Sequence, residues 1–389
     1  MGADRFDPQR GNAPPSLALW LVLLLVAAYP KIWFILGDWV TREGLMLPNG
    51  GTWFGRDFSN LYLGGRLAMA GEPIYDVIAY QALLADFGIT AGQNSSYPPT
   101  VYLLGAPLSF LPYGVALALW HVGGALLFVL AARRFIPFHW GWLFLFPPML
   151  SIPNGQYGLY TAALWMFAFA GSGVAAGIAT IKPHLGIFLA LAMLVQRRWR
   201  MIATAIAVAL ALLIAAELAF GLTRDFLTQG TGMQMRILLT DTAQPYFSNM
   251  PSTFVMLRGT PLAWAAQVAV AIAAFILILP ILKLPLHRQV FALATATFVV
   301  LPYAFAYDMA VVQVGIAAML WRDWGRMGLI ERLALPLAFL ATVYVVLTPV
   351  ALLATLVIQR RVLLAETRHL REKAGHEEDR DHHQTLQAR

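Results

Sequence analysis

Long apolar stretches separated by short polar turns dominate the chain. Thirteen apolar segments lie roughly at 17–36, 98–111, 113–132, 138–152, 157–170, 172–181, 184–196, 201–220, 262–282, 289–303, 309–321, 333–347 and 349–360. A helix needs about 20 apolar residues to cross the hydrocarbon core of a bilayer, and fewer where neighbouring helices shield it. Because the apolar runs are continuous and do not alternate, they predict an all-α polytopic membrane protein and not a β-barrel.

Composition excludes a water-soluble globule. Of the 389 residues, 59% are hydrophobic and 12% are charged, and the mean hydropathy is +0.66. Soluble domains carry about 25% charged residues. The chain has no cysteine, which excludes disulfide scaffolds, cysteine-ligated zinc and cysteine nucleophiles. The first segment continues through Tyr29-Pro30-Lys31 without a small-residue cleavage site, so it predicts a helix and not a signal peptide.

Basic residues orient these segments. The net charge is +7, and 19 of the 27 lysines and arginines fall near the two termini or in loops such as Arg197-Arg198-Trp199-Arg200. Under the positive-inside rule, these loops and both termini are cytoplasmic. We therefore expect a multi-pass protein of a bacterial-type inner (plasma) membrane, surrounded by membrane lipid. The positive charge indicates orientation, and no nucleic acid is expected as a partner.

Two cytoplasmic termini require an even number of crossings, so one of the thirteen segments does not cross the membrane. Either 98–111 or 138–152 can be that segment, and the pattern leaves the choice open. We expect a bundle of about 12 transmembrane helices within one domain, 1–365. A charged tail, 366–389, is expected to extend the last helix and to fray into disorder.

Two larger loops face the extracytoplasmic side in this topology, at 37–97 and 221–261. The first loop contains two amphipathic stretches, 57–70 and 76–87, which predict interfacial helices. Within the bundle, Gly173 and Gly177 have the spacing of small residues that pack helices together, so we assign them to packing and not to a site.

Charged residues at the lip of a membrane are costly and therefore mark candidate sites. Asp57 precedes the first predicted interfacial helix, where it is either an N-cap or a general base facing a cleft. Lys182 lies between two short apolar runs on the predicted outer side, against the positive-inside tendency. This cation needs a lipid phosphate or a protein carboxylate as its partner. Asp308 is an acid that either pairs with Lys182 or lines the same cleft, and Asn154-Gly155-Gln156 is by default a plain turn.

The order of several short motifs resembles glycosyltransferase family 87. These motifs are Asp57-Phe58, Gly71-Glu72-Pro73, Tyr97-Pro98-Pro99, Gly155-Gln156 and Ile181-Lys182-Pro183. The resemblance covers about residues 55–200 and continues more thinly at Asn249-Met250-Pro251-Ser252 and near Asp308. It implies a GT-C fold, a polyprenyl-phosphate sugar as donor, and often mannose as the sugar. Gly158 departs from the asparagine that the family often has two places after its Gly-Gln.

The resemblance also implies roles for individual residues. Asp57 matches the acidic residue that acts as catalytic base, and Lys182 matches the Lys-Pro position near the donor phosphate, with Arg56 or Arg258 as further phosphate ligands. The candidate substrate-binding residues are Tyr97, Asn154, Gln156, His184, Asn249, Tyr307 and Asp308. We expect transfer of a hexose with inversion to an extracytoplasmic glycolipid or glycan acceptor. The sequence requires no cofactor and no metal site, and dependence on a divalent metal stays open.

A secondary transporter or lipid-linked-sugar flippase is the alternative from a different functional class. Transporters favour internal repeats and broken helices with charges near the membrane midplane. This chain has no similarity between its halves, and its acids gather at the predicted outer lip. The enzyme is therefore the favoured interpretation.

Overall fold

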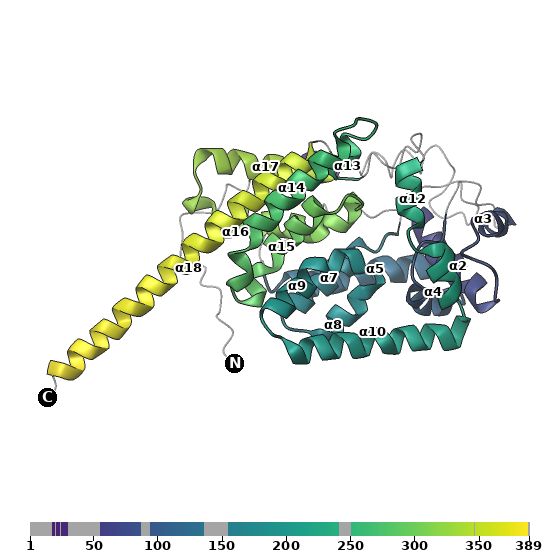
Figure 1. Cartoon of the computed structure of the whole chain (residues 1–389), viewed down its shortest axis with the longest axis horizontal. Coiled ribbons are helices and arrows are strands. Elements are labelled where there is room, and N and C mark those ends of the chain that lie inside the picture. The colour runs from purple at the N-terminus through teal and green to yellow at the C-terminus, as the bar shows by residue number, and fades with distance from the viewer. Residues whose placement is uncertain are drawn as a thin grey trace.

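A computed structural model describes residues 18–19, 21–23, 25–29, 55–86, 94–135, 155–240, 250–345 and 347–387. Within these ranges, all regular secondary structure is helical. The helices between α2 and α12 gather in one part of the molecule, and α13 to α18 gather in another (Figure 1). Contacts of α15 with α7 and α9, and of α16 with α7, join the two parts.

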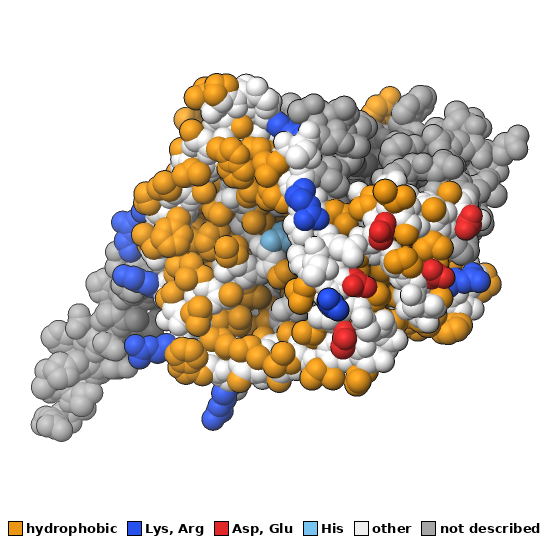
Figure 2. Space-filling model, turned by 45° about the vertical axis from the view of Figure 1, so that its right-hand side comes forward, with side chains coloured by type: hydrophobic (Ala, Val, Ile, Leu, Met, Phe, Trp, Pro, Cys, Tyr) orange, Lys and Arg blue, Asp and Glu red, His pale blue; other side chains and the backbone are white. Residues whose placement is uncertain are grey.

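Four helices are long and apolar enough to cross a membrane. They are α5 (Tyr113–Ala132), α10 (Trp199–Phe220), α14 (Ala263–Ile278) continued by η7 (Ile281–Lys283), and the first part of α18 (Thr348–Gln387). Each coincides with a predicted apolar segment. The surface in Figure 2 is dominated by hydrophobic side chains, and the acidic side chains visible there all lie in its right half. These features confirm the prediction of a membrane protein.

Other predicted crossings form shorter helices. They are α7 (Gly158–Phe169), α8 (Gly173–Ile178), α9 (Ile187–Val195), α15 (Leu286–Val300), α16 (Ala310–Arg322) and α17 (Leu329–Tyr344). At about 1.5 Å per residue, α7 is roughly 18 Å long and α8 roughly 9 Å. The hydrocarbon core is about 30 Å thick, so neither helix spans it alone. The count of 12 transmembrane helices therefore stays a prediction.

Helix α8 packs lengthwise against α10. A Cβ atom on Gly173 would lie 2.8 Å from the Cβ of Thr204, and one on Gly177 would lie 2.7 Å from the Cβ of Val208. Because both contacts advance by four residues on each helix, α8 and α10 run in the same direction. The two glycines allow the helix backbones to approach, which confirms their assignment to packing.

The described part of the predicted first outer loop, 55–86 and 94–97, contains the expected pair of helices, α2 (Arg56–Met69) and α3 (Val77–Asp86). The Asp76 carboxylate caps α3, because its Oδ1 accepts hydrogen bonds from the N–H groups of Ile78 at 3.0 Å and Ala79 at 2.9 Å. Helix α2 packs on α4 (Tyr102–Leu108), which follows the single turn η1 (Pro99–Val101).

Helix α4 bears on the open question of which segment does not cross. Its seven residues span roughly 10 Å, which is too short to cross a bilayer. The other candidate, 138–152, lies outside the described residues. Because α7 and α8 are also shorter than the bilayer is thick and 138–152 is not described, the choice between 98–111 and 138–152 stays open.

Further elements lie in the described part of the predicted second outer loop and in the C-terminal part. They are α11 (Thr223–Asp225), η5 (Phe226–Gly230), α12 (Met233–Thr240), α13 (Thr253–Met256), η8 (Ala306–Met309) and η9 (Trp324–Arg326). Helix α18 continues to Gln387, so the tail expected to fray into disorder is helical up to that residue. Helices α15 and α16 are buried along most of their length, and they hold both ends of the segment between them, 301–309.

Candidate active site

Asp57 lies in the first turn of α2 and does not cap this helix. Gly55 is the N-cap residue, with a φ of 74°, and its carbonyl accepts a hydrogen bond from the Tyr113 hydroxyl at 2.6 Å. The interpretation of Asp57 as an N-cap is therefore wrong. Its half-buried carboxylate instead accepts a hydrogen bond from Nε2 of Gln156, 99 residues further along the chain.

The turn that carries Gln156 is built for this contact. Gly155 has a φ of 80°, and a Cβ atom there would overlap the Cβ of Phe58 on α2. Only glycine accepts both the positive φ and this close approach. Trp120 Nε1 on α5 donates a hydrogen bond to the Gly155 carbonyl at 2.9 Å. The Gly155-Gln156 turn is thus anchored on two helices, and it is more than the plain turn that its composition suggests.

Lys182 and Asp308 form a buried ion pair. The Lys182 Nζ atom donates to both Asp308 carboxylate oxygens, at 2.8 and 2.9 Å, and the two side chains are 7% and 2% exposed. Lys182 has an extended backbone, with φ −132° and ψ 74°, between the turns η3 (Ala179–Ile181) and η4 (Pro183–Gly186). The protein carboxylate is therefore the partner of this cation, as one of the two sequence interpretations expected.

Aromatic rings surround the ion pair. The Lys182 Nζ atom lies 4.8 Å from the ring centroid of Tyr307 and 5.7 Å from that of Tyr157, both within cation–π range. The Tyr157 ring in turn lies 4.9 Å from the Tyr97 ring, and Phe305 stacks on Tyr307 at 4.9 Å. This cluster reaches from the first outer loop to the segment that carries Asp308.

Electrostatic interactions connect the ion pair with Asp57. Burial raises the pKa of the Tyr97 phenol, and the negative charges of Asp57 and Asp308 raise it further. Burial likewise raises the pKa of the Tyr307 phenol, and both acids again contribute. The two phenols therefore stay protonated near neutral pH. Gln156, which donates to Asp57, directly precedes Tyr157, whose ring faces Lys182, so Asp57 and the Lys182–Asp308 pair lie on either side of the start of α7.

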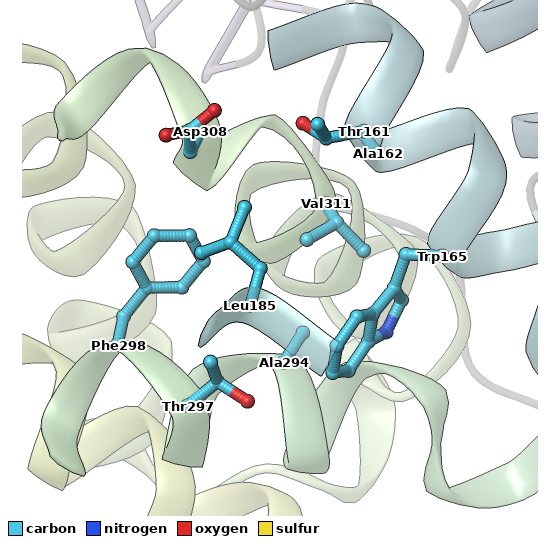
Figure 3. Close-up of a pocket in the computed structure, with 9 residues that line it drawn as sticks. All are labelled: Thr161, Ala162, Trp165, Leu185, Ala294, Thr297, Phe298, Asp308 and Val311. Atoms are coloured by element: carbon cyan, nitrogen blue, oxygen red, sulfur yellow. The ribbon is translucent and has the colours of Figure 1, made fainter. Parts of the chain in front are cut away.

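A small cavity lies beside this site. It measures about 20 Å³ and is lined by Thr161, Ala162, Trp165, Leu185, Ala294, Thr297, Phe298, Asp308 and Val311. Asp308 and Thr161 lie along one side, above the apolar side chains (Figure 3). A cavity of this size holds about one water molecule, so it is too small for a sugar.

The sequence model of glycosyltransferase family 87 matches residues 96–305, which is just over half of the chain. The chain belongs to glycosyltransferase family 87. It is therefore a glycosyltransferase with a sugar donor and an acceptor, which favours the enzyme over the transporter or flippase. The match includes the Gly155-Gln156 turn and Lys182, whereas Asp57 and Asp308 lie outside it. The chain matches no curated protein and no solved structure.

The other predicted site residues of this family 87 enzyme are placed as follows. His184 packs edge-on against Tyr303, with ring centroids 5.9 Å apart. Arg258 follows α13 in the second outer loop, which is tied to the Asp308 segment because Ser252 Oγ donates to the Pro302 carbonyl at 2.8 Å. Asn154, Asn249 and the side chain of Arg56 lie outside the described residues.

Sequence reasoning missed Tyr157 and Thr161 on the same helix. Tyr157 contacts Lys182 through its ring, and Thr161 lines the cavity beside Asp308. The only available signal was a tyrosine directly after Gly155-Gln156, and one aromatic residue at a predicted membrane interface is not distinctive. Over the part of the chain that the structure describes, no three metal-ligating side chains come together.

Proposed function

We propose that this enzyme transfers a hexose, with mannose as the first candidate, from a polyprenyl-phosphate donor to an extracytoplasmic glycolipid or glycan acceptor. The configuration at the anomeric carbon is inverted, and Asp57 is the general base. The observation that carries this proposal is a single site holding a half-buried carboxylate and a buried lysine within one aromatic cluster. A base and a cation near the leaving group are the groups that such a displacement needs.

The reaction is a single displacement. Asp57 takes the proton of the acceptor hydroxyl while the hydroxyl oxygen forms a bond to the anomeric carbon. The bond between that carbon and the phosphate oxygen breaks, and its electron pair leaves with the polyprenyl phosphate. Attack occurs on the face opposite the leaving group, so the configuration inverts. The hydrogen bond from Gln156 Nε2 orients the Asp57 carboxylate for this proton transfer.

The ammonium group of Lys182 is held in place by its ion pair with Asp308. An ammonium group has three N–H donors, and two of those on Lys182 are directed at the Asp308 oxygens. The third is available to a phosphate oxygen, while Asp308 keeps the lysine charged and fixed in position. Lys182 thus acts on the departing phosphate as an already oriented donor, with Arg56 and Arg258 as further candidates.

The proposal includes the placement of the enzyme in the membrane. Residues 1–365 form one GT-C-like domain with about 12 transmembrane helices, cytoplasmic termini and an extracytoplasmic site in a bacterial-type inner membrane. The short helices α7, α8 and α9 all adjoin the segments that carry Gln156 and Lys182. The polyprenyl chain occupies the apolar environment beside these helices, and the acceptor reaches Asp57 from the outer side.

Asp57→Asn tests the catalytic base directly. We expect sugar transfer from radiolabelled polyprenyl-phosphate mannose in isolated membranes to fall by about 10²- to 10⁴-fold, because an amide cannot accept the proton. Expression and thermal stability should be unchanged. The matched control is Asp86→Asn, which alters an exposed acid on α3 in the same outer loop. Retained transfer by Asp57→Asn would contradict the assignment of the base.

A further inference from the structure

The start of α7 carries two buried polar atoms without a hydrogen-bond partner. The Tyr157 hydroxyl and Oε1 of Gln156 are both inaccessible to solvent and unpaired, and the two residues are only 2% and 8% exposed. Buried polar groups are nearly always paired in folded proteins, since leaving one unpaired costs free energy. Two such atoms on consecutive residues indicate a place where a ligand supplies the missing partners.

The same position is the N-terminus of a helix without a side-chain cap. Tyr157 is the N-cap residue of the 12-residue helix α7, and its side chain makes no capping hydrogen bond to the first turn. The first N–H groups of a helix have no acceptor within the helix, and they form the positive end of its dipole. Gly158, the first helical residue, has no side chain to shield them. Helix ends of this kind bind phosphate.

The surroundings place this helix end between the two parts of the active site. Gln156 donates to Asp57 on one side, and the Tyr157 ring contacts the Lys182 ammonium on the other. One turn further along α7, Thr161 lines the cavity beside Asp308. A group bound at the start of α7 is therefore adjacent to the base, and it is also adjacent to the lysine.

We propose that the N-terminus of α7 is a phosphate-binding site, in which the first-turn N–H groups and the Tyr157 hydroxyl bind the phosphate of the donor. This inference rests on the proposed function, because the phosphate it assigns is that of a polyprenyl-phosphate sugar. The N–H groups stabilise the negative charge that grows on the phosphate as the glycosidic bond breaks. Oε1 of Gln156 is an acceptor, so it suits a sugar hydroxyl and not the phosphate.

Binding to the full-length protein in phosphatidylcholine nanodiscs tests this site without turnover. The probes are a polyprenyl phosphate, the polyprenol of the same chain length, and phosphatidic acid. The variant is Tyr157→Phe, which removes only the hydroxyl. The matched control is Tyr160→Phe on the same helix, whose hydroxyl already donates to the Trp120 carbonyl at 2.7 Å. Thermal unfolding of each variant shows whether the fold is kept.

We expect Tyr157→Phe to weaken polyprenyl-phosphate binding about tenfold, as loss of one hydrogen bond to a charged group predicts. Polyprenol binding should be unchanged, and Tyr160→Phe should bind both probes as the wild type does. Unaltered polyprenyl-phosphate binding by Tyr157→Phe, or an equal loss for the polyprenol, would overturn the phosphate site.

Two other outcomes separate this inference from the proposed function. If phosphatidic acid binds as tightly as polyprenyl phosphate and depends equally on Tyr157, the site takes a lipid headgroup and the donor assignment is overturned. If the wild type binds no polyprenyl phosphate, the proposed donor class fails, and the inference fails with it. A wild type that binds polyprenyl phosphate beside an unaffected Tyr157→Phe variant overturns the inference alone.

Discussion

Gly155 is the residue on which the geometry of the proposed base depends most. Its positive φ turns the chain into α7, and the missing Cβ lets the turn lie against Phe58, the neighbour of Asp57. The contact between Gln156 and Asp57 follows from this approach. The absence of a side-chain methyl group at position 155 thus allows Gln156 to orient the Asp57 carboxylate.

Gly155→Ala should therefore impair sugar transfer beyond what backbone strain at this position explains. The added Cβ would overlap the Cβ of Phe58, so the turn must shift and Gln156 moves away from Asp57. We expect kcat for sugar transfer to fall at least tenfold, by the loss of about 1.4 kcal/mol of transition-state stabilisation. Steady-state kinetics in membranes measures this.

Gly171→Ala is the matched control for this prediction. Gly171 also has a positive φ, 102°, but a Cβ atom there meets nothing within 4 Å. Both variants carry the same kind of backbone strain, about 1–3 kcal/mol. Equal kinetics in the two variants would mean that strain alone, and not the contact with Phe58, explains the effect.

At the level of elements, the interrupted helix around Lys182 is joined to η8 through the ion pair. Lys182-Pro183 separates the turns η3 and η4, and the ion pair links this segment to Asp308, 126 residues away. Breaking a buried pair by removing one partner costs about 3–5 kcal/mol, whereas replacing both by apolar residues is often neutral. Because of this asymmetry, comparing single and double variants of the pair distinguishes a structural role of Lys182 from a role in sugar transfer.

Variants of the pair should behave accordingly. We expect Asp308→Leu alone to lower the thermal midpoint strongly, because it leaves the lysine charge buried and unpaired. Lys182→Met combined with Asp308→Leu should regain most of that stability. Transfer should stay low in the double variant, because no ammonium remains to stabilise the phosphate. Recovery of both stability and transfer would show that Lys182 serves only as the partner of Asp308.

On the scale of the whole molecule, charge distribution and helix lengths together predict the membrane orientation. Helix α10 is roughly 33 Å long at 1.5 Å per residue, enough to cross the bilayer, and it begins within the basic sequence Arg197-Arg198-Trp199-Arg200. Because α8 runs parallel to α10, the chain that enters α8 and the chain that enters α10 lie at the same end. The site residues Gln156 and Lys182 lie away from that end.

The lack of cysteine makes this orientation directly testable. The test introduces one cysteine at a time, as Asp86→Cys in the predicted first outer loop or Arg200→Cys in the first turn of α10, and treats intact cells with a membrane-impermeant maleimide. We expect Asp86→Cys to react in intact cells and Arg200→Cys to react only after the membrane is opened, as the positive-inside rule requires. The wild type should show no label. The reverse labelling pattern would show that the membrane orientation is opposite to the one proposed.

The sequence by itself determined the class of the protein and many of its helices. The membrane class and the positions of α5 and α10 follow from hydropathy, and the start of α3 follows from Asp76, because these signals act between residues that are close along the chain. Ordered short motifs also indicated family 87, which the match over 96–305 confirms.

Only the tertiary structure decided how the site is assembled. It replaced the capping role of Asp57 by a contact with Gln156, chose a carboxylate as the partner of Lys182, and added Tyr157 to the cluster. It also made α7 and α8 too short to cross a membrane separately. The contacts of Asp57 with Gln156 and of Lys182 with Asp308 join segments 99 and 126 residues apart, and no local periodicity or composition encodes which distant side chains meet.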